Sequence, residues 1–553
     1  MLKEKIHISL TSSLSKIFGN TAENDIQLFE KFSALRGEKF SFQAVMNYRG
    51  DYPCSCEVKA DSDIGGIKLY IVRDVPVGLA AYEGRCDDRY IGIESGLYPD
   101  MLEEYPGEVR LIPNLNTVLW VEVNVPKGTA SGIHEIKFSA VSEHGDTAEA
   151  VFLLDIIGAA LPEQTFPVTQ WFHCDCLASY YGVEPLSEKH WEIISAFMDN
   201  YAEFGGNMIL TPIFTPPLDT VVGGERPTVQ LVDVIRSGKG YEFGFDKLER
   251  FMSLAESKGI RLFEMAHLFT QWGAEFTPKI VDSDGRKLSG WFLKADSEEY
   301  RELIIPLLTA LKEFLKRTGR FERCYFHISD EPTEENISTY SLAHAAVKEI
   351  LSDCKVMDAL SDVRFYNEGL VRIPVADDAH IESFIAAGAA PLWTYFCCAQ
   401  GRDGAANRFI SMPSQRCRIL GLQMYKYNIS GFLHWGFNYY YSQHSKRLIN
   451  PYLITDTDGT YPSGDAFLVY PLSDGRAAPS IREFVFNEAL QDMRALRLLE
   501  KYMPHDDIVD MIESRSEEIR FTMYPADREK LFDSSFICGI RSLINEKIAK
   551  FSD

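Results

Sequence analysis

Two acidic residues, Asp330 and Glu331, stand side by side before a proline in the stretch CYFHISDEPTEEN (324–336). The residue before a proline is disfavoured in the helical conformation, so Glu331 is predicted to end a strand rather than to begin the next helix. The helix start itself explains Glu334 and Glu335, because acidic side chains are favourable in a first turn. Paired carboxylates are the groups that act as acid, base or nucleophile in glycoside hydrolysis. We therefore take Asp330 and Glu331 as candidate catalytic residues.

The spacing of the pair limits the mechanism. Successive side chains on a regular strand point to opposite faces, so Asp330 and Glu331 could not both face one substrate from an undistorted strand. They also cannot be the usual carboxylate pairs, which lie about 5 Å or about 6.5–9.5 Å apart on two sides of the bond. If both reach one site, the chain must bulge or twist where the strand ends. They would then serve the same edge of the substrate.

The elements that position the pair begin near residue 163. Apolar runs of strand length alternate there with amphipathic helical stretches, which is typical of a parallel sheet. Eight such runs predict a closed (β/α)8 barrel of the TIM type. A doubly wound open sheet is the structural alternative, but no glycine-rich GxGxxG follows the first run. The eight predicted strands are 167–175, 207–214, 261–268, 324–331, 355–362, 371–378, 391–399 and 431–438.

The segments before and after the predicted barrel have different patterns of apolar and polar residues. Residues 119–125 and 133–141 alternate apolar and polar side chains around the turn sequence PKGTASG, which predicts antiparallel strands of a β-sandwich. After residue 480 the chain reads as amphipathic helices. We expect three parts: an N-terminal β-sandwich over 1–162, a catalytic barrel over 163–500, and a C-terminal helical extension over 501–553 packed on the barrel.

Composition excludes several classes of function. The net charge of −24 repels phosphate backbones and anionic membranes, so neither nucleic acid nor a membrane is an expected partner. No segment has about 18 continuous apolar residues. The 11 cysteines lack a framework spacing, which favours reduced thiols in a cytoplasmic protein. Cys397–Cys398 and FHCDC (172–176) have no second ligand pair at zinc-like spacing, so we expect no metal and no cofactor. A neutral carbohydrate suits this surface.

The ends of the predicted strands supply further candidates, because barrel enzymes carry their chemistry at the C-terminal ends of the strands. Aromatic side chains there can stack on a sugar ring, and imidazole or amide groups can hold its hydroxyls. The candidate substrate-binding residues are His173, His267, Gln271, Trp272, Trp393, Tyr395, Trp435 and Asn438. Asp362 and Asp377 end the fifth and sixth predicted strands.

The seventh predicted strand carries no carboxylate, which favours a mechanism without an enzyme nucleophile. In substrate-assisted hydrolysis the 2-acetamido oxygen of the sugar attacks the anomeric carbon. Glu331 would be the general acid and later the base that activates water. Asp330 would hold the acetamido N–H and stabilise the oxazolinium intermediate. The closeness of two like charges would raise one pKa and keep Glu331 protonated near neutral pH.

The motifs together resemble those of a known family. The DEP at 330–332 ends the fourth strand, RGEKFSFQ and PKGTASGIHEI lie upstream, and GDAFLVYP lies at 464–471. This layout resembles glycoside hydrolase family 123, the retaining β-N-acetylgalactosaminidases. The resemblance implies that Asp330 is the stabiliser, that Glu331 is the acid/base, and that the substrate is a β-linked 2-acetamido sugar, most often N-acetylgalactosamine. Tyr395 is then the candidate for the acetamido oxygen, and Trp435 or Trp393 for the wall beside its methyl group. TPIFTPPLDT (211–220) and HLFTQWGA (267–274) are similar to uncharacterised relatives, which leaves the sugar open.

Two alternatives remain at this point. One is a barrel glycosidase that acts on a sugar without the acetamido group and pairs Glu331 with Asp362 or Asp377. The other is a carbohydrate-binding protein without catalysis. The sequence leaves the sugar configuration, the linkage, exo or endo action and the oligomeric state open.

Overall fold

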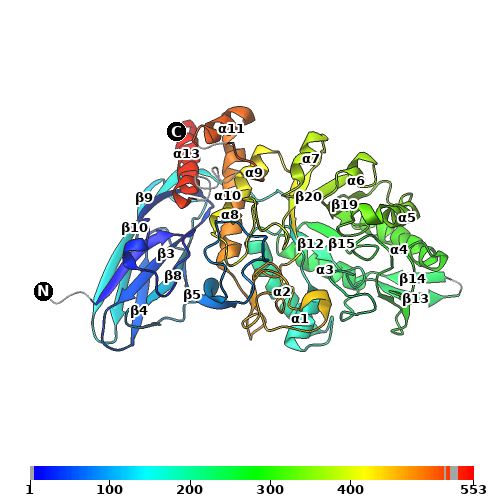
Figure 1. The fold of residues 1–553 in the computed structure, drawn as a ribbon, viewed down its shortest axis with the longest axis horizontal. Helices are drawn as coiled ribbons and strands as arrows, with labels where there is room; N and C mark the ends of the chain where they lie inside the picture. Colours follow the sequence, from blue (N-terminus) through cyan, green and yellow to red (C-terminus); the bar gives the residue numbers. More distant parts are fainter. Residues whose placement is uncertain (1–4, 239, 516–517, 523–532, 553) are drawn as a thin grey trace.

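The computed structural model describes residues 5–238, 240–515, 518–522 and 533–552. An N-terminal β-sandwich lies beside a barrel, and helix α10 (Ile481–Leu499) runs between them (Figure 1). One sheet has the order β1-β3-β8-β5-β6 and the other β2-β10-β9-β4-β7. The strands are β1 (Ile6–Ser12), β2 (Lys31–Arg36), β3 (Lys39–Tyr48), β4 (Cys54–Asp61), β5 (Ile67–Val77), β6 (Gly96–Glu104), β7 (Val109–Leu111), β8 (Asn116–Asn124), β9 (Gly132–Ser142) and β10 (Thr147–Ala160).

Strand β8 shows why the sandwich and the barrel form one body. Its Leu119, Val121 and Val123 face the core between the two sheets, as their alternation predicts. Its Trp120, on the opposite face, packs against Phe484 of α10, with ring centroids 5.2 Å apart. The outer face of this sheet is therefore covered by the barrel instead of solvent.

The second part is a closed barrel of eight parallel strands, as the sequence predicts, and each predicted run contains one strand. The strands are shorter than predicted: the fourth ends at Phe326, so Asp330 and Glu331 lie in the segment that follows it. In order they are β11 (Val168–Gln170), β12 (Met208–Thr211), β15 (Leu262–Met265), β18 (Cys324–Phe326), β19 (Lys355–Leu360), β20 (Ile373–Asp377), β21 (Trp393–Tyr395) and β22 (Gly431–His434).

Helices cover the outside of the barrel (Figure 1), and most of the apolar side chains that they bury join one core cluster with the barrel. In α2, for example, Trp191, Ile194, Met198 and Tyr201 are buried at helical spacing, as the sequence predicts. The helices are α1 (Cys174–Tyr181), α2 (Glu188–Glu203), α3 (Asp246–Ser257), α4 (Glu298–Arg317), α5 (Ile337–Val347), α6 (Arg364–Asn367), α7 (Ile381–Ala386), α8 (Gln415–Arg418) and α9 (Leu420–Lys426). Two hairpins, β13–β14 (Asp233–Ser237, Gly240–Gly244) and β16–β17 (Ile280–Val281, Lys287–Ser289), extend the loops after β12 and β15, and β23–β24 (Tyr470–Pro471, Ala477–Ala478) lies before α10.

The C-terminal helices are α11 (His505–Glu513) and α13 (Ser534–Ser552). Helix α13 packs against α10 and also against β2 and β10 of the sandwich. Its buried Arg541 donates to Asp492 of α10 at 2.8 Å and to Glu38 of the sandwich at 2.5 Å. One guanidinium thus joins three parts of the fold, because each carboxylate comes from a different one.

Among the helices that the structure describes, none has the length and apolar character needed to cross a bilayer. The eleven cysteines are all free thiols.

Candidate active site

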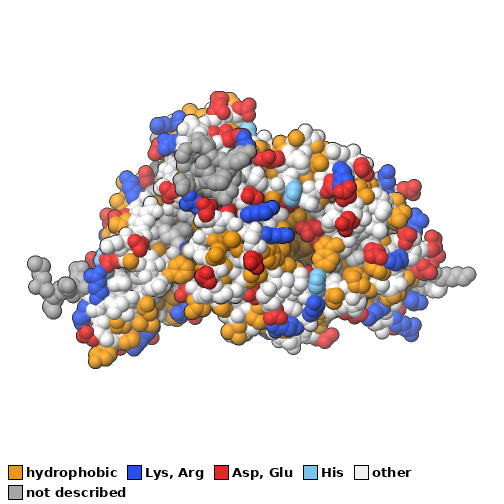
Figure 2. Space-filling view, viewed as in Figure 1, with side chains coloured by type: hydrophobic (Ala, Val, Ile, Leu, Met, Phe, Trp, Pro, Cys, Tyr) orange, Lys and Arg blue, Asp and Glu red, His pale blue; other side chains and the backbone are white. Residues whose placement is uncertain are grey.

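A cavity of about 80 Å³ lies at the C-terminal end of the barrel strands. Figure 2 shows a hollow near the middle of one face of the molecule, bordered by hydrophobic, acidic and basic side chains. The residues that line the cavity come from the ends of several strands and from the loops after them, as in other barrel sites. They are Trp171, His173, Leu218, Asp219, Gln271, Trp272, Asp330, Glu331, Ala359, Tyr395, Cys397, Cys398, Leu433, Trp435 and Tyr461.

Asp330 and Glu331 both line this cavity because the backbone turns at Glu331. Its φ is +44°, in the left-handed region that residues with a side chain rarely adopt. Neighbouring strand ends hold the turn: Trp272 N–H donates to Asp330 O at 2.9 Å, and Glu331 N–H donates to Ala359 O at 3.1 Å. Such strain persists only where the surroundings impose it. The change of direction brings two adjacent carboxyl groups to one pocket.

Glu331 is hydrogen-bonded to Tyr395, whose hydroxyl donates to Oε1 at 2.6 Å. Burial raises the pKa of Glu331, the Tyr395 hydrogen bond opposes that shift, and the charge of Asp377 adds to it. A carboxyl group with a raised pKa is suited to donate a proton near neutral pH.

Asp330 is more deeply placed, with 6% of its surface exposed. Burial raises its pKa well above the usual range, the charge of Glu331 raises it further, and His327 opposes the shift. Its Oδ1 is buried and has no hydrogen-bond partner within the part of the chain that the structure describes. Because a buried acceptor without a partner is costly, this oxygen is suited to receive a donor from a ligand.

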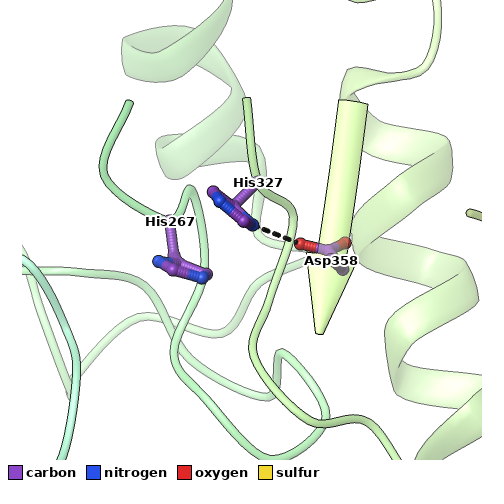
Figure 3. A group of neighbouring side chains, drawn as sticks. All are labelled: His267, His327 and Asp358. Atoms are coloured by element: carbon purple, nitrogen blue, oxygen red, sulfur yellow. Dashed lines mark hydrogen bonds and ion pairs between the residues drawn. The ribbon is translucent and has the colours of Figure 1, made fainter. Parts of the chain in front are cut away.

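Beneath the cavity, the barrel interior holds His267, His327 and Asp358, which Figure 3 shows as neighbours. Their ligand-type atoms lie within 4.8 Å of one another, which raises the question of a metal. The two imidazole rings are stacked, with centroids 4.1 Å apart and an angle of 23° between their planes. A metal bound by histidine lies in the ring plane at about 2.0–2.1 Å from the nitrogen. Two nearly parallel rings cannot both direct a lone pair at one ion, so this cluster does not fit a metal site.

Two other side chains of the cavity wall, His173 and Trp435, are held in place by hydrogen bonds to residues outside the cavity. Arg226 forms two 2.7 Å hydrogen bonds to Asp175 and donates to His173 Nδ1 at 3.0 Å. His173 Nε2 in turn donates to Trp435 O at 2.9 Å, and burial together with Arg226 lowers the pKa of His173 to about 3. The His173 imidazole is therefore neutral, and its two hydrogen bonds connect Arg226 to the backbone of Trp435. Trp435 Nε1 donates to Asp465 at 2.9 Å, which fixes the indole at the wall.

The structure brings together seven of the residues that the sequence singled out: Asp330, Glu331, His173, Gln271, Trp272, Tyr395 and Trp435. It places Trp393, His267 and Asn438 elsewhere. Trp393 lies deeper in the barrel, where Gly431 leaves room for its ring. His267 lies beneath the cavity, where its ring stacks on His327. Asn438 Oδ1 accepts a hydrogen bond from the backbone N–H of the wall residue His173 at 2.8 Å.

The two alternative carboxylates do not line the cavity. Asp362 is paired with Arg364 at the surface. Asp377 accepts from His380 Nδ1 at 2.9 Å and from Gln400 Nε2 at 3.2 Å. Both acids thus have partners of their own outside the cavity wall.

Sequence reasoning missed several wall residues, including Asp219, Tyr461 and Trp171. Asp219 lies in the long loop after β12, where its carboxylate accepts from Tyr439 and, at 3.1 Å, from Tyr461. Its backbone N–H donates to Gln271. No periodic pattern marks such a loop, so only the three-dimensional structure brings these side chains together. Trp171 directly follows β11 and could have been found as a strand-end aromatic.

The sequence matches the family described as "Glycoside hydrolase 123, catalytic domain" over residues 171–499. No protein of curated function matches it. A family 123 glycoside hydrolase from Clostridium perfringens, described in terms of glycolipid glycan hydrolysis, superimposes with a TM-score of 0.76 at 15% identity, over 99% of each chain. A Bacteroides ovatus GH5 xyloglucanase with a bound heptasaccharide reaches a TM-score of only 0.31 at 9% identity, over 86% of this chain and 100% of that chain.

Proposed function

This chain belongs to glycoside hydrolase family 123, and on that premise we propose that it is a retaining glycosidase that cleaves β-linked 2-acetamido sugars, with N-acetylgalactosamine as the expected sugar. The observation that carries the proposal is the buried Oδ1 of Asp330, which has no hydrogen-bond partner among the described residues and lies beside the acid Glu331 in one cavity. An acetamido N–H is a donor of the kind that this oxygen lacks.

In the proposed first step, the carboxyl proton of Glu331 passes to the glycosidic oxygen as the bond from that oxygen to C1 breaks. The acetamido carbonyl oxygen forms the new bond to C1, which gives an oxazolinium ion. Asp330 accepts a hydrogen bond from the acetamido nitrogen and stabilises the positive charge. In the second step, the Glu331 carboxylate takes a proton from water, the water oxygen attacks C1, and the acetamido group is restored.

The rest of the cavity supports this assignment. The Tyr395 hydroxyl lies next to Glu331 and is proposed to reach the acetamido oxygen once the substrate is bound. Trp435, fixed by Asp465, is proposed as the wall beside the acetamido methyl group. Asp219 has both oxygens bound by Tyr439 and Tyr461, so we assign it to substrate binding rather than to nucleophilic attack. The free cysteines favour a reducing compartment such as the cytoplasm.

A panel of 4-nitrophenyl β-glycosides tests the proposal. We expect turnover of the 2-acetamido sugars and little of their 2-hydroxyl counterparts, and we expect inhibition by a thiazoline mimic of the oxazolinium. Glu331→Ala should lower kcat by about 10²–10⁴-fold on these substrates. The exposed neighbour Glu335→Gln serves as the matched control. Equal turnover of the 2-hydroxyl sugars, together with indifference to the thiazoline, would contradict the substrate-assisted mechanism and favour a glycosidase of another type.

A further inference from the structure

Four titratable side chains lie fully buried beneath the cavity: Glu264, His267, His327 and Asp358, each with 0% of its surface exposed. Charged groups in such a position are costly unless they are paired. The proposed reaction uses none of them directly. Three of them, Glu264, His327 and Asp358, are linked by hydrogen bonds.

His327 lies between two carboxylates. Its Nε2 is 2.7 Å from Glu264 Oε1, and its Nδ1 is 3.1 Å from Asp358 Oδ1. A neutral imidazole has one N–H and would set a bare lone pair against one of these oxygens. Only the doubly protonated ring can donate to both.

The other partners of the two carboxylates are donors as well. Glu264 accepts from Trp171 Nε1 at 2.7 Å and from Thr169. Asp358 accepts from the Tyr340 hydroxyl at 2.5 Å and from Ile328 N–H at 3.0 Å. An ionised carboxylate only accepts hydrogen bonds, and both groups accept from several donors here. Burial raises the pKa of Asp358, and its hydrogen bonds with His327, Tyr340 and Ile328 oppose that shift. Burial alone would lower the pKa of His327, but its hydrogen bonds to Asp358 and Glu264 raise it to about 9.

The buried imidazole is tied to the catalytic pair through a short, well-held segment. His327 lies three positions before Asp330, and this stretch runs beside the segment after β15. Leu268 N–H donates to His327 O at 3.1 Å, and Phe269 N–H donates to Ile328 O at 3.0 Å. The charged groups that act on Asp330 are Glu331, His327, Asp358 and Glu264. His267, stacked on His327, is kept neutral because burial and the charge of His327 lower its pKa well below the usual range.

We propose that His327 is a positioning residue: an imidazolium, fixed between Glu264 and Asp358, that favours the negative charge of the catalytic pair on Asp330 against the opposing effects of burial and of Glu331. This rests on the roles proposed above for that pair. Two adjacent carboxyl groups in one pocket titrate together, and a cation below one of them decides which holds the proton. Without it, two buried anions would act on Asp330 unopposed.

The first test needs no substrate. Nitrogen-15 NMR of histidine-labelled wild-type protein at pH 7.5 should show one buried imidazole protonated on both ring nitrogens. That signal should be missing in His327→Gln, while the His267 signal remains neutral. A single protonated nitrogen on His327 would overturn the proposal, whether or not the variant folds.

The second test uses the pH dependence of kcat/KM on a 4-nitrophenyl 2-acetamido glycoside. Asp330 must be ionised for catalysis, so loss of the cation should move the acidic limb of His327→Gln to higher pH by about one unit or more. His190→Gln is the matched control, because His190 is equally buried and its Nε2 donates to Cys174 O at 2.8 Å on the outside of the barrel. An unchanged acidic limb of the kcat/KM profile in His327→Gln would overturn the proposal and show that His327 has only a structural role. Failure of wild-type protein to cleave any 2-acetamido sugar would count against the proposed function and leave the NMR result standing.

Discussion

Glu331 is held by three constraints at once. Its backbone is left-handed, its N–H is bonded to Ala359 of the neighbouring strand, and its carboxyl group receives the Tyr395 hydroxyl. A left-handed conformation at such a residue costs about 1–3 kcal/mol, which the surrounding contacts must offset. The result is an acid whose direction is fixed before a substrate arrives, which is favourable for catalysis.

Replacing Tyr395 by Phe should change both the rate and the pH dependence. The hydroxyl stabilises the ionised form of Glu331, so its loss should raise the Glu331 pKa further. Because a general acid acts in its protonated form, the alkaline limb of the kcat/KM profile should move to higher pH. The maximal rate should fall by about 10–100-fold, the range that one hydrogen bond to a charged group supplies.

Tyr300→Phe is the control for this prediction. It also removes a buried hydroxyl, which donates to Leu268 O at 2.6 Å on the outside of the barrel. It should leave the pH profile unchanged. An unmoved alkaline limb in Tyr395→Phe would show that the hydroxyl does not act on Glu331.

At this scale the period of a strand predicted that the chain must turn if Asp330 and Glu331 are to reach one pocket. The sequence also predicted an extended Glu331 before Pro332, which was wrong, because the φ of Glu331 is +44°. It could not predict the left-handed Glu331, since contacts with Trp272 and Ala359 impose that conformation from distant parts of the chain. Trp393 was misplaced for a related reason. Trp393 and Tyr395 point to the same side of β21, but only the end of the strand reaches the cavity.

Among the elements, the loop between β5 and β6 (78–95) links the sandwich to the cavity wall. It packs against the loop after β21 (396–414), which carries the wall residues Cys397 and Cys398, and against the start of α8. Tyr90 donates to Gly401 O at 2.8 Å, and Asp87 pairs with the buried Arg416 of α8 at 3.1 Å. The sandwich therefore helps to shape the cavity from outside the barrel.

Removal of the Asp87 carboxylate should weaken this contact. Asp87→Ala removes one buried partner of the Arg416 guanidinium, which keeps its hydrogen bonds to Ala405 O, and breaking a buried pair in this way costs about 3–5 kcal/mol. We expect a lower Tm in calorimetry and a raised KM, since the loop that carries Cys397 and Cys398 loses its support. Glu143→Ala is the control, because it breaks an exposed pair with Arg110 that is worth about 0–1 kcal/mol. Equal Tm values for the two variants would contradict this role of the loop.

The eight barrel strands were predictable because each is an apolar run bounded by turns. Their ends were predicted too far along the chain, since residues such as Ile328 are buried after strand pairing has stopped. The loop between β5 and β6 has no apolar period, and its contacts are with residues more than 300 positions away. Sequence patterns within a short window carry no signal for such contacts.

For the whole molecule, buried carboxyl groups with raised pKa values set the pH dependence of stability. Burial raises the pKa of Asp465 to about 7 and that of Glu488 to about 7. An unfolded carboxyl group titrates near pH 4, so between about pH 4 and 7 each of these two groups binds more protons in the folded protein than in the unfolded chain. Their contribution to the free energy of unfolding therefore falls as pH rises through this window.

Between pH 5 and 7 we expect Tm to fall less steeply, or to rise more steeply, with pH in Asp465→Asn than in wild type, because the variant loses the contribution of Asp465. The amide keeps an acceptor for Trp435 Nε1 while it removes the titrating group. Asp458→Asn, at an exposed pair with Arg447, should leave the slope unchanged. Thermal scans across this pH range measure both, and an identical slope in Asp465→Asn and wild type would exclude Asp465 as the source.

The bridge made by Arg541 has a consequence for how the chain is made. Glu38 precedes every barrel strand in the order of synthesis, whereas its guanidinium partner Arg541 follows them all. The sandwich can fold while later segments are still being translated, but Glu38 can pair with Arg541 only after α13 has left the exit tunnel. In a nascent chain stalled before residue 534, the β-sandwich and the barrel should therefore pack against each other only loosely. Proteases should cut such a chain between the sandwich and the barrel, whereas the released protein should resist cleavage there.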